Sequence, residues 1–171
     1  SKIFGELLML IENEYRGSKY ALTLAYNDSP DDKPCVVPKN LYIIGLMNTA
    51  DRSLAIIDYA LRRRFSFVEM NPQFDSKAFK EYQSGIGNEV FDKLIATILE
   101  MNKEISKDDS LGPWFQIGHS YFCGMDKESC TNDRLCEIVE YDIIPMIQEY
   151  WFDNKDKVEK WSKALIAVFN D

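Results

Sequence analysis

Residues 41–53 read LYIIGLMNTADRS and carry the most informative pattern in the chain. Leu41 to Met47 is a continuous apolar run of strand length, which is typical of a central strand of a parallel sheet covered on both faces. A polar loop follows this run and contains Asn48 and Asp51. Because open α/β sheets bind ligands at the carboxyl ends of their strands, we predict that these two side chains lie at a ligand site.

The next elements along the chain add basic side chains. Residues 54–63 are predicted to form a helix whose end carries three consecutive arginines, and residues 65–70 alternate as a second strand. An amide and a carboxylate can orient a water molecule, and planar guanidinium groups suit phosphate oxygens. Phosphoryl transfer needs both tasks: the attacking water is positioned, and the charge that develops on the γ-phosphate is neutralised. Two simpler interpretations stay open: residues 48–52 as a plain strand-to-helix turn, and Arg62 to Arg64 as a solvated helix end that is favourable against the helix dipole.

The remaining pattern divides the chain into an α/β part and a helical part. A helix is predicted over residues 1–12 and the arms of a hairpin over residues 20–26 and 35–37. After Pro72 the apolar spacing becomes helical, and helices are expected at residues 76–83, 88–106, 133–152 (kinked at Pro145) and 158–169. We therefore predict two domains, residues 1–72 and 73–171, with the fold class α/β plus all-α. The aromatic side chains of the second domain are expected in its core: Trp114, Phe115, Tyr121, Phe122, Tyr150, Trp151 and Trp161.

The composition excludes several classes of protein. The chain has 171 residues, with 20 Lys and Arg against 28 Asp and Glu, so its formal charge is −8. This acidic balance disfavours a nucleic-acid-binding domain, which needs a basic face. With 46% hydrophobic residues, disorder is not expected, and the apolar runs are too short to span a membrane. The first residues lack a signal-peptide pattern, so we expect a cytoplasmic protein without a membrane partner.

The four cysteines and the single histidine leave a zinc site arithmetically possible. Its ligands would be His119, Cys123, Cys130 and Cys136. Their spacing contains none of the close cysteine pairs that structural zinc sites use, so reduced thiols and no bound metal are expected.

Two motifs in this order resemble one known family. The signature MNTADR at residues 47–52 and the sequence IGHSYF at residues 117–122 are similar to those of the McrB-type AAA+ GTPase subunits of modified-cytosine (5-methylcytosine) restriction systems. The likeness covers nearly the whole chain, since residues 1–12 resemble the helix that follows the Walker B strand. It implies the distal part of an AAA+ P-loop NTPase α/β domain, followed by a helical lid subdomain.

The resemblance also implies roles for individual residues. Asn48 would be the sensor-1 residue that contacts the γ-phosphate or the lytic water, and Asp51 would help to place that water. Arg62 and Arg63 would be arginine fingers that reach the nucleotide of a neighbouring subunit, whereas Arg64 is expected to support the fold. In the lid, the nucleotide-binding residues would be Gly118, His119 and Ser120, where the sensor-2 helix begins and a helix N-terminus would face phosphate or base.

The whole protein implied by this family is a ring oligomer, with a hexamer expected, that uses GTP and Mg²⁺. It would drive an McrC-type nuclease subunit and bind DNA through a separate N-terminal domain. This chain has no G-x-x-x-x-G-K-[ST] motif and no Walker B carboxylates, so alone it is expected to bind no cofactor tightly and to be inactive. Exposed apolar surface is predicted on residues 1–12 and 41–47.

Two other functions remain open from the sequence. One is an assembly or interaction module that does not hydrolyse nucleotide. The other is an ATP-dependent AAA+ relative of the MoxR or dynein-like groups.

Overall fold

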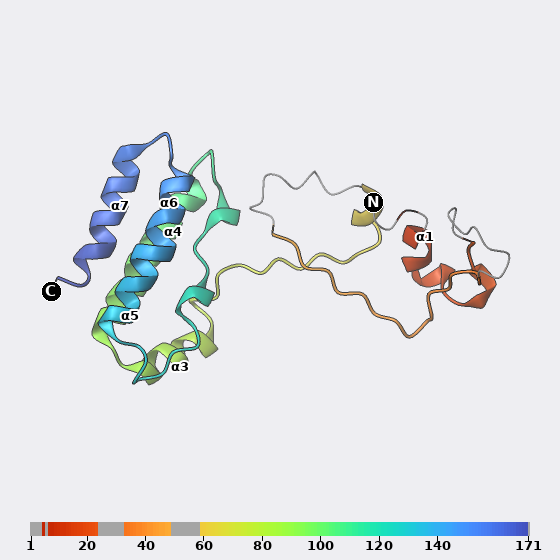
Figure 1. Ribbon diagram of the computed structural model, residues 1–171, viewed down its shortest axis with the longest axis horizontal. Coiled ribbons are helices and arrows are strands. Elements are labelled where there is room, and N and C mark those ends of the chain that lie inside the picture. The colour runs from red at the N-terminus through yellow and green to blue at the C-terminus, as the bar shows by residue number, and fades with distance from the viewer. Residues whose placement is uncertain (1–4, 6, 24–32, 49–58, 171) are drawn as a thin grey trace. The chain divides into compact units, whose positions relative to one another are not determined.

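The computed structural model describes residues 5, 7–23, 33–48 and 59–170. The chain divides into two compact units, Ser1–Glu69 and Met70–Asp171 (Figure 1). This division falls three residues before the boundary proposed from the sequence. The predicted start of the helix at residues 54–63, and Asp51, lie outside the described residues.

The first unit contains four short helical elements among its described residues. They are α1 (Leu7–Ile11), the 3₁₀ helices η1 (Asn13–Tyr15) and η2 (Ser18–Tyr20), and α2 (Tyr59–Arg62). The Arg16 guanidinium holds the end of α1, because its Nε and Nη2 donate to the Ile11 carbonyl at 3.0 and 2.8 Å, and Nη1 donates to the Leu41 carbonyl. The predicted hairpin is present as one antiparallel bridge, with Leu22 and Cys35 exchanging hydrogen bonds of 2.9 and 2.8 Å.

The structure has no strand at residues 41–47 or 65–70, which are described, so the prediction of two strands there is wrong. Neither segment joins a ladder of hydrogen bonds among the described residues, and Figure 1 draws neither as a strand. A strand needs a neighbour to receive its backbone groups. The described part of this unit offers none to residues 41–47, and most of their side chains are exposed: Ile44 is 89% exposed and Leu46 91%.

The apolar surface predicted for the first unit is confirmed at residues 41–47, whereas among the described residues of the segment 1–12 only Met9 carries it, at 39% exposed. Residues 41–47 carry it, as do Val68 and Met70 at the ends of the two units. In contrast, α1 is largely covered, since Leu8, Leu10 and Ile11 are buried.

The regular elements described in the second unit are all helical. Its elements are α3 (Lys77–Ile86), α4 (Glu89–Lys107), the 3₁₀ helices η3 (Pro113–Phe115) and η4 (His119–Phe122), α5 (Asn132–Glu137), the π-helix η5 (Ile138–Ile143), α6 (Ile144–Tyr150) and α7 (Lys155–Ala167). Helix α4 contacts α5 and α7, and α6 packs on α7 (Figure 1). The four predicted helices are confirmed to within a few residues.

Side chains at the helix starts explain these boundaries. Ser76 caps α3, Asn88 caps α4, Thr131 caps α5 and Asn154 caps α7, each with a side-chain oxygen that accepts a backbone N–H of the first turn. Helix α3 ends at Gly87, whose φ of 64° is the left-handed conformation that glycine adopts without strain. These signals are local, which is why the sequence predicts them well.

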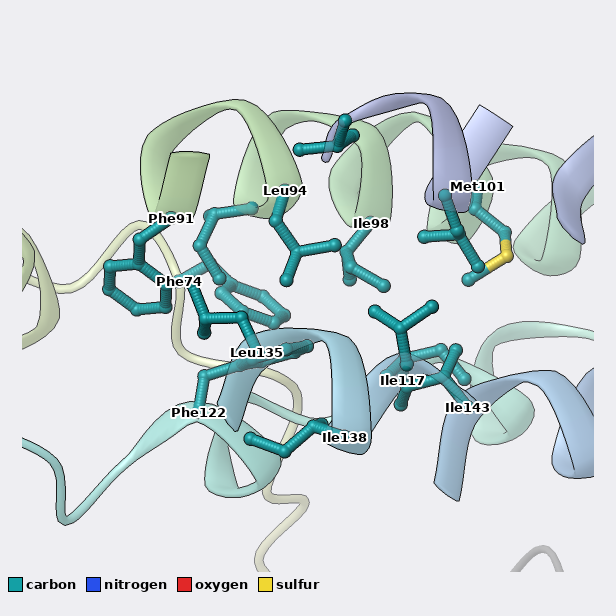
Figure 2. Packing of buried hydrophobic residues seen from close by; sticks show 14 of the residues in the cluster. Phe74, Phe91, Leu94, Ile98, Met101, Ile117, Phe122, Leu135, Ile138 and Ile143 are labelled. Atoms are coloured by element: carbon teal, nitrogen blue, oxygen red, sulfur yellow. The ribbon is translucent and has the colours of Figure 1, made fainter. Parts of the chain in front are cut away.

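One apolar core holds the second unit together. Figure 2 shows side chains from α4, η4, α5 and η5 pointing into the same space, among them Phe91, Ile98, Phe122 and Leu135. The face predicted for α4 is buried, and so are Trp151 and Trp161. Trp114 and Tyr121 are exposed, so the prediction that they belong to the core is wrong.

The long predicted helix near the C-terminus contains a π-helical middle. Pro145 lies in the first turn of α6 and has no N–H, so the carbonyl four residues earlier cannot be bonded as in an α-helix. The six residues Ile138–Ile143 before α6 are wound as a π-helix. The predicted disturbance at Pro145 thus takes the form of a wider turn on its N-terminal side.

Candidate functional site

Of the two residues predicted to act on the attacking water, the structure describes only Asn48. Asn48 is an exposed residue of the first unit. Its expected partner Asp51 lies outside the described residues, so the distance between the amide and the carboxylate is not part of the structure.

The three arginines that follow the helix differ in their surroundings. Arg64 is 17% exposed and forms an ion pair with Glu12, with Nη2 2.8 Å from Oε1. Arg62 and Arg63 are exposed at the end of α2, and the Arg62 guanidinium lies 5.9 Å from the centre of the Phe67 ring. The ion pair agrees with a structural role for Arg64, whereas Arg62 and Arg63 are the exposed members of the three.

The predicted lid residues lie in a loop of the second unit that is fixed at both ends. At its first end, the Asn102 side chain of α4 pairs with the backbone of Ile117. The Ile117 N–H donates to Oδ1 at 2.7 Å, and Nδ2 donates to the Ile117 carbonyl at 2.9 Å. Asn102 is 3% exposed, so both bonds are shielded from water.

Tyr82 of α3 fixes the other end of this loop. Its hydroxyl donates to the Phe122 carbonyl at 3.0 Å and accepts the Met125 N–H at 3.0 Å. Burial raises the pKa of the Tyr82 hydroxyl, which therefore stays protonated and able to donate. Phe122 itself is completely buried beside Phe91 and Phe74 (Figure 2).

His119 lies between these two fixed ends. Its Nδ1 accepts the backbone N–H of Gln73 at 3.2 Å. The rings of Phe74 and Phe79 approach the imidazole at centroid distances of 6.1 and 6.0 Å, both close to edge-on. Since Nδ1 is the acceptor, the proton of the neutral ring is on Nε2 in this arrangement.

The helix that begins at Gly118-His119-Ser120 is shorter than the predicted sensor-2 helix. It is the 3₁₀ helix η4, which has four residues and no side-chain cap. A single 3₁₀ turn aligns too few peptide dipoles to attract phosphate strongly, so the argument from a helix N-terminus does not apply here. Any contact of these residues with nucleotide has to come from their own side chains or amides.

The described residues give no geometry for a metal site. They contain no group of three or more His, Cys, Asp or Glu side chains that could hold an ion. Cys123 instead donates its Sγ–H to the His119 carbonyl at 3.3 Å, and burial raises the pKa of the Cys130 thiol. The part of the chain described here contains no helix long and apolar enough to cross a membrane.

Sequence reasoning missed Asn102, Tyr82 and Gln73. A signal for Asn102 was present, because it lies four residues after Ile98 and three before Ile105 on the apolar face of α4. A polar residue on such a face is buried and needs partners. The roles of Tyr82 and Gln73 depend on contacts across about 40 residues, for which the sequence has no local signal.

Comparison with known proteins identifies both units. Residues 1–65 match the AAA domain family (dynein-related subfamily), and residues 93–159 match the McrB alpha-helical lid domain. The chain is also 47% identical, over 98% of its length, to a protein named the type IV methyl-directed restriction enzyme EcoKMcrB subunit of Escherichia coli (strain K12). The chain is of the McrB type.

This similarity gives the fold class of the chain. Its McrB-type architecture is part of an AAA domain followed by a helical lid, and the lid match lies within the second unit. The chain spans 37% of the length of the Escherichia coli relative. The match to the dynein-related subfamily is also what an ATP-dependent AAA relative would produce, so it does not choose between GTP and ATP.

Proposed function

We propose that this chain belongs to a GTP-hydrolysing motor subunit of a modified-DNA restriction complex. The observation that carries the proposal is the identity of 47% along 98% of the chain to a restriction enzyme subunit. The motor subunit would assemble as a ring, a hexamer in our proposal, and drive an McrC-type nuclease. DNA would be bound by a separate N-terminal domain, since this chain has a net charge of −8.

Within this motor the chain would supply residues that act on bound GTP. Asn48 would contact the γ-phosphate or the attacking water, and Asp51 would accept a hydrogen bond from that water. Arg62 and Arg63 would donate to phosphate oxygens of the neighbouring subunit's nucleotide, and their exposed guanidinium groups are consistent with this. In comparable phosphoryl-transfer enzymes an arginine finger contributes about 10³–10⁵ in rate.

The lid residues Gly118, His119 and Ser120 would contribute to nucleotide binding, His119 through its backbone amide. Mg²⁺ would neutralise charge on the phosphates when bound. The described residues contain no cluster suited to an ion, so we assign no ligand of Mg²⁺ to them. Catalysis by the chain itself would then depend on positioning and on charge supplied by its arginines.

Single arginine variants of the full-length protein test the finger assignment. Arg62→Ala or Arg63→Ala is expected to lower GTP turnover by about 10³ or more while nucleotide affinity stays nearly constant. Arg64→Ala is the matched comparison, because its ion pair with Glu12 predicts a loss of stability in place of a selective loss of turnover. Unchanged turnover in both finger variants would overturn the assignment.

Subunit mixing tests whether the fingers act between neighbours. Asn48→Ala subunits are mixed with subunits that carry Arg62→Ala or Arg63→Ala. At some of the interfaces that form, the wild-type Asn48 of one subunit meets the wild-type arginine of its neighbour. Activity should therefore return on mixing if the arginine acts on the neighbour's nucleotide, whereas no recovery would place it on its own subunit's nucleotide.

The choice of nucleotide and the assembly-module alternative are tested together. Turnover is measured with GTP and with ATP on the full-length protein. Selectivity for ATP would remove the restriction-motor proposal but keep the AAA fold, and no turnover with either nucleotide would favour the assembly module.

A further inference from the structure

The first residues of the second unit form a tightly bonded turn centred on Gln73. Its side-chain Nε2 donates to the Asn71 carbonyl at 3.0 Å, and its own carbonyl accepts the Ser76 N–H at 3.1 Å. Pro72 between them has a fixed φ, which further limits the backbone. The side chain and the carbonyl of Gln73 are thus used within its own segment, while its backbone N–H points elsewhere.

That N–H is bound by a side chain 46 positions later. It donates to Nδ1 of His119 at 3.2 Å. The next residue, Phe74, is 3% exposed and lies in the core against Phe79 and Phe122 (Figure 2). Phe74 is therefore the first buried residue of the second unit and follows directly on the bonded N–H of Gln73, whereas residues 66–71 and Gln73 itself are exposed.

The loop that carries His119 is built to hold this side chain in place. Asn102 pairs with Ile117 on one side of it, and the Tyr82 hydroxyl binds Phe122 and Met125 on the other. The imidazole is further confined by two aromatic rings of the lid. Such support for a half-buried histidine predetermines the direction of Nδ1.

We propose that His119 is a positioning residue that anchors the start of the lid by binding the Gln73 backbone. It fixes the point at which the chain, having left the AAA unit, becomes part of the rigid lid. Its effect on turnover rests on the proposed function, because only in a motor does the position of the lid influence hydrolysis. A direct contact with nucleotide, as the family resemblance implies, is the competing role for the same side chain.

Three substitutions separate the anchor from other roles of the ring. His119→Phe keeps an aromatic ring but removes the acceptor, and His119→Ala removes both. His119→Asn keeps an acceptor, since its Oδ1 occupies about the same place as Nδ1. Tyr121→Phe in the same 3₁₀ helix is the control, because it removes only a hydroxyl that lies 3.7 Å from Met146 Sδ.

Residue-resolved amide exchange, followed by NMR on the intact chain, measures the anchor directly. The Gln73 amide should exchange about fivefold faster in His119→Phe and His119→Ala, stay within about twofold of wild type in His119→Asn and remain unchanged in Tyr121→Phe. His119 is the single histidine, so its imidazole nitrogens give an unambiguous signal, and we expect the Nε2–H tautomer. Wild-type exchange in His119→Phe, or the Nδ1–H tautomer, would overturn the anchor.

Nucleotide binding and turnover of the full-length protein then test the positioning role. His119→Phe should lower kcat by about fivefold with an unchanged Kd for GTP, and His119→Asn should restore kcat. Weaker GTP binding in both variants, with normal Gln73 exchange, would overturn the proposal in favour of a nucleotide contact. If the Gln73 amide exchanges faster in His119→Phe while kcat is unchanged, the contact is purely structural, and the positioning role is overturned as well. If the wild-type protein hydrolyses no GTP, the proposed function fails while the exchange experiment still decides on the anchor.

Discussion

Replacing Asn102 with alanine should destabilise the lid far more than the loss of one polar side chain on a surface. The substitution removes two hydrogen bonds, of 2.7 and 2.9 Å, that the Asn102 side chain makes to the backbone of Ile117. Asn102 is 3% exposed, so both bonds are buried. The Ile117 N–H and carbonyl would then be buried without partners. Each such group costs about 1–3 kcal/mol, so we expect a total loss of about 3 kcal/mol.

Tryptophan fluorescence during urea unfolding measures this loss without interference from the first unit. All three tryptophans, at positions 114, 151 and 161, lie in the second unit. For a unit of about 100 residues, a loss of about 3 kcal/mol corresponds to a fall in Tm of about 10–20 °C. The denaturation midpoint should shift while the dependence on urea stays the same.

Lys103→Ala provides the matched control on the neighbouring position of α4. Its ammonium pairs with Glu100 on the exposed face, a contact worth less than about 1 kcal/mol. If the free energy of unfolding of Asn102→Ala lies within about 0.5 kcal/mol of the wild-type value, these two bonds are not needed to hold the loop, and the prediction is refuted.

Three further predictions follow from other contacts. Hydrogen bonds from Lys157, Ser110 and Trp151 hold the pKa of Asp108 far below its ordinary value of 3.8, so its stabilising effect is complete above that pH and declines as pH falls below it. Asp108→Asn should cost about 2 kcal/mol at pH 7 and flatten the acid limb of the urea midpoint plotted against pH; an unchanged limb would contradict this. Tyr82→Phe should cost about 1–2 kcal/mol in the same assay, because the Phe122 carbonyl and the Met125 N–H lose their partner. The exposed residues 41–47 should cause concentration-dependent self-association in sedimentation velocity, and a single monomer at all concentrations would contradict this.

The sequence by itself determined the elements whose causes are local. The apolar spacing of α4 predicts its bounds to within one residue, and Ser76, Asn88 and Asn154 are local signals for a helix start, although α7 begins at Lys155, three residues before its predicted start. The two motifs at residues 47–52 and 117–122, in that order, likewise indicated the McrB resemblance, which the comparisons support.

Tertiary structure decided the features that depend on a neighbour distant in the chain. An apolar run such as residues 41–47 has the composition of a strand, but its hydrogen bonds require a partner strand that the described residues do not supply. Arg64 differs from Arg62 and Arg63 through its ion pair with Glu12, 52 positions earlier. His119 accepts a backbone N–H from 46 positions away, which no spacing in the sequence could indicate. The physical reason is that a polar group takes its role from the partner that folding brings within hydrogen-bond distance.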